Sequence, residues 1–344
     1  MDRTANDLGD AFQDSALKIG SVSVIGRAFL APMSGVTDVG MRRIAHDFGA
    51  ALTFTEMVAA DQYARGDAAN RLKAEGAGVN VHAVQIAGCE PWAMAEAARL
   101  AQDSGAAIID INMGCPAKSV TNGYAGSHLM RDLDLALALI RATVQAARVP
   151  VTLKMRLGWD QGSMNAADLG RIAEAEGVAM LTVHGRTRQQ FYAGKADWAA
   201  IRLVKEAVAI PVVANGDCTS AADAASMLAQ SGADAVMIGR SAIGRPWFVG
   251  EVAHFLARKT ERRPLPGAVR GDAAIAHYES LLERLGAAQG VRHARKHLAA
   301  YAEWSGATNA ATLRRQLVAL DRPSSVKAIL RELFDHPPLT EAAA

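Results

Sequence analysis

Eight short apolar runs recur along this chain, and after each of them the pattern changes to that of a loop or a helix. The runs are aliphatic or β-branched over their whole length, as expected of parallel strands that are covered on both faces. Eight strands that alternate with helices predict an α/β fold, a (β/α)₈ or TIM barrel, because eight parallel units favour closure of the sheet. The predicted strands are 28–32, 51–55, 81–86, 107–111, 151–155, 180–183, 211–214 and 235–238.

The residues at the ends of these runs are mostly polar. In a barrel the carboxyl ends of the strands converge on one mouth, so these side chains are expected to share a site. An open sheet is the rival fold, but it favours a Gly-x-Gly-x-x-Gly turn after the first strand, and this chain has Met-Ser-Gly-Val-Thr at 33–37. The run ends are Met33, Glu56, Gln85, Asn112, Lys154, His184, Asn215 and Arg240.

Helical patterns separate the strands, and their start signals are clear. Ser220 followed by Asp223 predicts a capping box, and Asp197 predicts an N-cap. Such patterns occur at 91–102, 166–176, 198–208 and 220–229.

The alternation stops after residue 248, where strands disappear. At 344 residues the chain exceeds the roughly 250 residues of a typical barrel, so a second domain is expected. Residues 262–267, rich in Arg and Pro, predict a linker, and helical patterns follow at 268–286, 290–304, 308–320 and 323–334. The predicted organisation is an N-terminal extension at 1–20, a barrel at 21–263, a small all-helical C-terminal domain at 264–336 and a tail at 337–344.

Composition indicates a cytoplasmic globular protein. Half of the residues are hydrophobic and 21% are charged, and no apolar run approaches the ~18 residues that cross a bilayer. We therefore expect no membrane association. Three cysteines without a pairing motif argue against disulfides and against a cysteine-based metal site, and no metal is predicted. The net charge is +2, but residues 268–334 hold 10 Lys and Arg against 6 Asp and Glu, which fits either a polyanionic partner or ordinary surface charge.

Two residues stand out as candidates for chemistry. Cys115 lies just after the fourth strand and before Pro116, where a thiol over the mouth could exchange a proton, although such a cysteine is also often a small hydrophobe. Lys154 ends an apolar strand, and its ammonium should meet an anion there. That anion could be a reduced flavin, a substrate carboxylate or a structural Asp or Glu, and a Schiff-base role is a further alternative.

The last two strand ends predict a phosphate site. Barrels commonly bind phosphate between the loops after strands seven and eight, where glycine allows close approach of the backbone. Gln85 could meet the edge of a flavin ring, and His184 could reach its phosphate side. The candidate phosphate residues are Asn215, Gly216, Asp217, Gly239 and Arg240.

Taken together these segments resemble the tRNA-dihydrouridine synthases, over about residues 22–335 and in order. The helical segment 291–297, Val-Arg-His-Ala-Arg-Lys-His, is similar to the bacterial B-type subgroup. One segment departs from that subgroup, because the loop after Cys115 continues as Lys118-Ser-Val-Thr-Asn-Gly-Tyr124, with fewer basic residues. The segments that carry the resemblance are 31–38, 55–57, 110–116, 154–156, 183–187, 214–217 and 238–240.

The resemblance implies an enzyme that binds FMN tightly and reduces the C5–C6 double bond of selected tRNA uridines with NADPH, or alternatively NADH. Cys115 would protonate C5, Asn112 would hold the uracil edge, and Arg186 would assist. The tail residues Arg292, Arg295, Lys296 and His297 would meet tRNA phosphates. The implied cofactor residues are Pro32, Met33, Ser34, Gln85, Lys154, His184, Asn215, Gly216, Asp217, Gly239 and Arg240.

Two other functions remain open at this stage. A flavin barrel could act on a free pyrimidine, as dihydroorotate dehydrogenases do, although the basic helical tail argues against that function. A non-catalytic RNA-binding protein is the third hypothesis, and the presence of Cys115, Lys154 and Asn112 argues against it.

Overall fold

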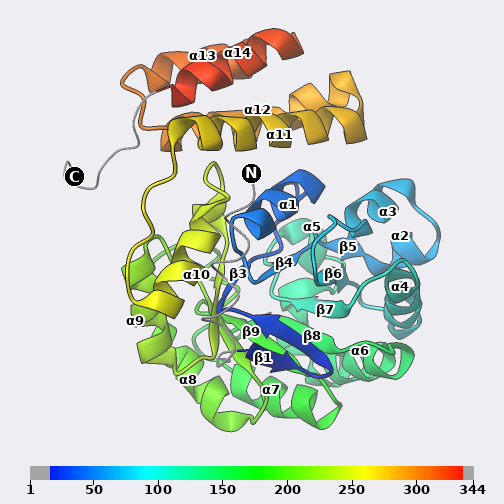
Figure 1. The fold of residues 1–344 in the computed structure, drawn as a ribbon. Helices are drawn as coiled ribbons and strands as arrows, with labels where there is room; N and C mark the ends of the chain where they lie inside the picture. Colours follow the sequence, from blue (N-terminus) through cyan, green and yellow to red (C-terminus); the bar gives the residue numbers. More distant parts are fainter. Residues whose placement is uncertain (1–15, 336–344) are drawn as a thin grey trace.

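The central element is a closed sheet of eight parallel strands (Figure 1), seen in a computed structural model that describes residues 16–335. The sheet closes where the last strand pairs with the first, and the predicted barrel is confirmed. A short strand, β5 (Val58–Ala59), pairs with the end of β6 and continues the line of β4. The barrel strands are β3 (Ala28–Leu30), β4 (Leu52–Phe54), β6 (His82–Ala87), β7 (Ile108–Met113), β8 (Val151–Arg156), β9 (Met180–His184), β10 (Val212–Asn215) and β11 (Ala235–Ile238).

Helices surround the sheet, and their starts follow the predicted signals. Ser220 and Asp223 form a capping box, and the Asp197 side chain accepts a hydrogen bond from the Ala200 backbone N–H. The surrounding helices are α1 (Val39–Asp47), α2 (Ala60–Ala64), α3 (Ala68–Ala74), α4 (Pro91–Asp103), α5 (Lys118–Thr121), α6 (Leu133–Ala146), α7 (Ala166–Ala175), α8 (Trp198–Ala207), α9 (Ala221–Ser231) and α10 (Phe248–Arg258), with 3-10 turns η2 (Gly126–Arg131) and η3 (Arg240–Ala242).

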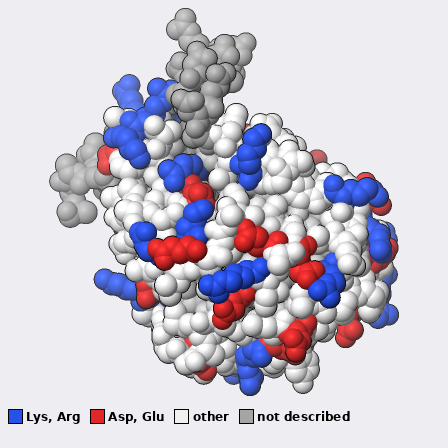
Figure 2. Space-filling model, turned by 90° about the horizontal axis from the view of Figure 1, so that it is seen from below, with Lys and Arg blue, Asp and Glu red and all other residues white. Residues whose placement is uncertain are grey.

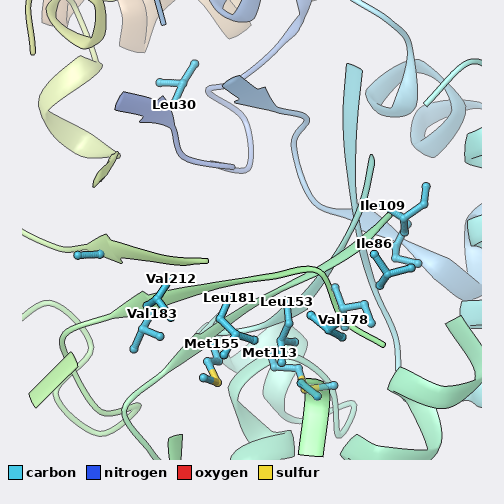
Figure 3. Packing of buried hydrophobic residues seen from close by; sticks show 14 of the residues in the cluster. Leu30, Ile86, Ile109, Met113, Leu153, Met155, Val178, Leu181, Val183 and Val212 are labelled. Atoms are coloured by element: carbon cyan, nitrogen blue, oxygen red, sulfur yellow. The ribbon is translucent and has the colours of Figure 1, made fainter. Parts of the chain in front are cut away.

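Side chains of each strand alternate between the helices and the barrel interior. On β8, Leu153 and Met155 belong to the apolar core shared with the helices (Figure 3), whereas Thr152 and Lys154 make hydrogen bonds across the interior. This period of two is the ordinary pleat of a β-strand. It follows that the polar run ends of neighbouring strands face one another inside the mouth.

A β-hairpin closes the amino end of the barrel. Its strands are β1 (Ala16–Ile19) and β2 (Val22–Ile25), drawn in dark blue in Figure 1. Ile19 and Val24 pack in the apolar cluster at the amino end of the barrel, so this hairpin shields that cluster from solvent. The sequence predicted only an extension over residues 1–20. Residues 1–15 of that extension and the predicted tail at 337–344 lie outside the described residues.

Four helices form a second layer above α1 and α10 (Figure 1), and no strand occurs between residues 239 and 335. Trp247 stacks on Tyr301 at this junction. The centroid of the Trp247 ring also lies 6.2 Å from that of Phe48 and 6.2 Å from that of Phe334. The predicted domain boundary at 263/264 falls in the segment between the two layers and stays a prediction. The helices are α11 (Gly267–Leu285), α12 (Ala287–Trp304), α13 (Ala310–Ala319) and α14 (Pro323–Phe334).

The surface charge is mixed on the face that points downward in Figure 1. Over most of the face drawn in Figure 2, Lys and Arg are interspersed with Asp and Glu. Within residues 16–335 no helix combines the length and the hydropathy that a bilayer crossing requires.

We predict that Gly250→Ala destabilises the protein, although alanine is the better helix former by about 1 kcal/mol. A Cβ at Gly250 would lie 1.9 Å from the Phe48 carbonyl oxygen, so α10 would have to move away from α1. We expect a loss of about 2 kcal/mol in the free energy of unfolding, measured in urea. Gly271→Ala in α11 is the control, because its Cβ would meet Phe334 at an ordinary 3.4 Å. Equal stability of both variants would contradict this account of the packing.

Candidate active site

A chain of polar side chains crosses the barrel interior below the mouth. Asp110 on β7 accepts hydrogen bonds from Thr152 Oγ1 at 2.6 Å and from Gln85 Nε2 at 2.7 Å. Gln85 Oε1 in turn accepts a hydrogen bond from Asn112 Nδ2 at 2.7 Å. All four side chains are buried, so each bond is made without competition from water. The chain fixes Asn112 at the end of β7.

Asn112 then positions the loop that carries Cys115. Its Oδ1 accepts hydrogen bonds from the backbone N–H groups of Gly114 at 3.2 Å and of Cys115 at 3.0 Å. Arg156, buried on β8, donates to the Gly114 carbonyl at 2.8 Å and holds the same loop from the other side. The backbone at Gly114 and Cys115 is therefore held by side chains from two strands, β7 and β8.

Lys154 lies beside this loop, because β7 and β8 pair Asn112 with Lys154 in register. Its Nζ donates to Asn215 Oδ1 at 3.1 Å, the one hydrogen bond recorded for this ammonium among residues 16–335. Burial lowers the pKa of Lys154 to about 8 and Arg156 adds to this, whereas Asp110 and Cys115 oppose it. The thiol is thus close enough to influence the lysine. An additional anion in the mouth would stabilise the charged form.

A cavity of about 370 Å³ opens next to Lys154, within the size range of small-molecule sites. It lies at the carboxyl ends of β3 and β8 to β11, and Trp304 of the helical layer contributes to its wall. Nine of the predicted cofactor residues line it. These are Pro32, Met33, Lys154, His184, Asn215, Gly216, Asp217, Gly239 and Arg240.

One end of the cavity is rich in fixed charge. Arg186 is almost fully buried and binds Asp217 through two hydrogen bonds of 2.9 and 2.6 Å. Arg240 lies 3.4 Å from the same carboxylate and over the Tyr192 ring. Burial and then Lys154 hold the pKa of His184 well below its usual range, and its Nε2 lies 3.3 Å from Arg186 Nη1. Because arginine can only donate, Nε2 accepts and the neutral ring carries its proton on Nδ1.

The remaining predicted residues lie elsewhere. Gln85 and Asn112 are bonded to each other below the mouth, and Ser34 is exposed on the loop after β3. In the helical layer Arg292 is exposed, Arg295 pairs with Asp321 at 2.9 Å, and Lys296 Nζ lies 3.2 Å from His293 Nε2. His297, by contrast, is buried under the helical layer rather than presented to solvent. The predicted roles of these residues stay predictions.

The sequence analysis missed several residues that build the site. Arg156 lies two positions after Lys154 and so shares its inward face, a signal that the period of two could have provided. Asp110 likewise lies two positions before Asn112 on β7, so both side chains point to the same face. Tyr192 and Trp304 come from a loop and from the helical layer, and nothing in their local sequence connects them with the mouth.

The other two cysteines are poorly suited to proton transfer. Cys218 lines the cavity, but burial raises the pKa of its thiol to about 12. Burial and Glu90 also raise the pKa of Cys89. Cys115 does not line the cavity, but its loop is held by Asn112, which pairs in register with Lys154, and it stays the predicted proton donor.

This fold and mouth define a class: barrel enzymes with a cationic cavity beside a positioned thiol. Residues 29–336 match the family model described as "Dihydrouridine synthase (Dus)". A "Probable tRNA-dihydrouridine synthase" of Rhizobium leguminosarum bv. phaseoli is 50% identical, covering 91% of this chain and 97% of that protein. The "tRNA-dihydrouridine synthase B" of Xanthomonas axonopodis pv. citri is 46% identical, covering 95% of this chain and 100% of that protein. The chain belongs to the dihydrouridine synthase family, and the predicted family and oxidoreductase class are confirmed.

The solved structures that resemble the chain share its fold at low identity. Histamine dehydrogenase from Rhizobium sp. 4-9 aligns with a TM-score of 0.53 and 14% identity, over 80% of this chain and 51% of that one. This likeness is one of barrel architecture.

We predict that Asp110 makes stability depend on pH. Burial raises the pKa of Asp110 from 3.8 to about 6 in the folded protein, so folding favours the protonated carboxyl group. The stabilisation that the protonated group gives is fully present below about pH 4 and is lost as the pH rises through 6. We expect the free energy of unfolding, relative to Asp110→Asn, to fall by about 3 kcal/mol between pH 4 and pH 7. Urea titrations at several pH values measure it, with exposed Asp134→Asn as control. A difference that does not change with pH would contradict the assignment.

Proposed function

We propose that this protein is a cytoplasmic tRNA-dihydrouridine synthase that uses FMN and NADPH to reduce the C5–C6 double bond of selected uridines. The names of the relatives, tRNA-dihydrouridine synthases, support the reaction and the RNA substrate. The observation that carries the proposal is that Lys154 lines the cavity and lies in register with Asn112, which holds the Cys115 loop.

The residues of the cavity fit FMN. Lys154 has one recorded hydrogen bond and can donate further to an anionic flavin ring. Arg240 is more than half exposed at the other end, where it can meet a phosphate, and Gly216 and Gly239 present backbone without a side chain. The neutral His184 lies between these ends and can donate from Nδ1. A flavin ring near Lys154 and a phosphate group near Arg240 would thus both find hydrogen-bond donors.

When bound, FMN supplies the hydride that is added to C6 of the uracil. The chain has to bind the base, hold its edge and deliver a proton to C5. Asn112 Nδ2 donates one N–H to Gln85, and Gln85 Nε2 donates one N–H to Asp110. Each amide keeps a second N–H, which can meet the uracil edge or the flavin. Cys115 can give the proton, because a thiol that is held in place is a competent general acid. The base must leave its stack to reach this mouth.

Contacts to tRNA are proposed for the helical layer. Residues 268–334 carry an excess of four positive charges, and Arg292 on α12 is exposed. Binding through phosphates should weaken as salt rises. The reaction is tested with an unmodified tRNA transcript and NADPH, with dihydrouridine as the readout. Turnover of free uracil or orotate in the absence of RNA would instead support a metabolite reductase.

We predict that Cys115→Ala retains a flavin that NADPH reduces but loses RNA turnover by at least about 100-fold, because only the proton donor is removed. Flavin reduction is followed by absorbance and turnover by dihydrouridine content of the tRNA. Cys89→Ala serves as the control, since burial and Glu90 raise the pKa of that thiol and make it the poorer proton donor. Normal turnover in the Cys115 variant would refute its role as the acid.

We predict that Lys154→Met binds FMN about tenfold more weakly, because a charge-assisted hydrogen bond to the flavin ring is lost. The dissociation constant is measured from flavin fluorescence after dilution. Lys327→Met removes a half-buried lysine that pairs with Glu279 on the helical layer, and it should leave FMN binding unchanged. An unaltered dissociation constant for the Lys154 variant would remove the lysine from the flavin site.

A further inference from the structure

A buried polar cluster joins the helical layer to the barrel, and the proposed function does not use it. Asp38 caps α1, with Oδ1 accepting a hydrogen bond from the Met41 N–H at 3.1 Å. Its Oδ2 lies 3.1 Å from His277 Nε2 on α11 and 3.7 Å from His297 Nε2 on α12. Both histidines are almost completely buried. We call Asp38, His277 and His297 the Asp38 cluster.

Hydrogen bonds link the cluster to Tyr301. The Tyr301 hydroxyl lies 3.0 Å from His277 Nδ1, and burial raises the pKa of this hydroxyl. His277 donates from Nε2 to Asp38. Although burial alone would raise the pKa of Asp38, His277 lowers it well below its usual range, so the carboxylate is ionised. Tyr301, His277 and Asp38 thus form one hydrogen-bonded chain from α12 through α11 to α1.

The same helices contact the loop that precedes Asp38. Lys296 Nζ lies 2.9 Å from the point that a Cβ on Gly35 would occupy. From the barrel side, Glu56 accepts a hydrogen bond from the Gly35 N–H. Within the loop, the Thr37 N–H donates to the Met33 carbonyl at 3.0 Å. Residues 33–38 are therefore held between β4 and the helical layer.

This loop is also part of the cavity wall. Met33 at its start lines the cavity, and Pro32 directly before it does so as well. Trp304, at the end of α12, lines the same cavity, where Arg245 lies 3.7 Å from its ring centroid. Helix α12 therefore approaches the cavity at two places: Lys296, near its middle, lies against the loop, and Trp304, at its end, lines the cavity.

A bound metal ion is the competing explanation for the cluster. Asp38, His293 and His297 place ligand atoms within 4.8 Å of one another. However, Lys296 Nζ already lies 3.2 Å from His293 Nε2, and its charge would repel a second cation at this position. Arg42 lies close enough to Asp38 for the carboxylate to raise the pKa of its guanidinium, against burial. The local positive charge is thus supplied by the chain itself.

We propose that His277 is a positioning residue that acts through Asp38 to hold loop 33–38 in its flavin-binding shape, so that the helical layer controls how firmly the cofactor is retained. This inference rests on the proposed function, since it assumes that Met33 faces the flavin. It gives the helical layer a second task besides contact with RNA. Binding of tRNA to that layer would then also affect flavin retention.

The test compares variants of the full-length holoenzyme without RNA. His277→Ala should raise the FMN dissociation constant, measured by flavin fluorescence, about tenfold, because a buried carboxylate loses its donor. His277→Gln keeps an N–H donor and should recover most of that affinity. Leu330→Ala is the matched control, because it opens the apolar core of the helical layer without touching Asp38. An equal rise in Leu330→Ala, or no rise in His277→Ala, would overturn the proposal.

Hydrogen exchange separates this proposal from the proposed function. In His277→Ala the amides of Gly35 and Thr37 should exchange at least about tenfold faster than in the wild type, and in Leu330→Ala they should not. If the wild-type protein retained no flavin, the proposed function would fail, and exchange at these amides would still decide whether His277 holds the loop. Unchanged exchange would overturn the positioning role.

Discussion

Closure of the parallel sheet is the constraint on which the rest of the structure depends. In a closed barrel each strand sends alternate side chains inward, and no strand edge remains to be paired. Lys154, Asn112 and Gln85 come from three neighbouring strands and face one space for this reason. The outward-facing strand residues, such as Leu153, are apolar and pack against the surrounding helices. One sheet can therefore have a packed apolar core on its outer face and a polar mouth inside.

The polar mouth is stable because its charges and donors are paired. Asp110 is buried but accepts two hydrogen bonds, and Arg186 is buried but holds Asp217 with two more. Buried groups of this kind would be costly if any partner were missing. The exception is Lys154, with one recorded protein hydrogen bond and a lowered pKa, and this is where an anionic cofactor would bring the largest gain.

Much of the fold could be predicted from the chain, since strand runs, caps and turn glycines are local signals. The eight strands agree with the structure within about two residues at each end, and the Ser220 capping box was predicted from two residues. The N-terminal hairpin was missed because its strands are four residues each and take their stability from contacts with the barrel floor. Trp304 was missed because it is distant in sequence from every other residue of the cavity.

The sequence by itself determined the fold class, the family and the ring of residues at the strand ends, because periodicity and turn chemistry act between neighbours along the chain. Only the tertiary structure decided which of these residues are bonded to each other. Asn112 holds the Cys115 loop, and Lys296 lies against the loop at Gly35. Such pairings depend on how strands close and helices dock, and burial then sets the pKa values that determine what each group can do.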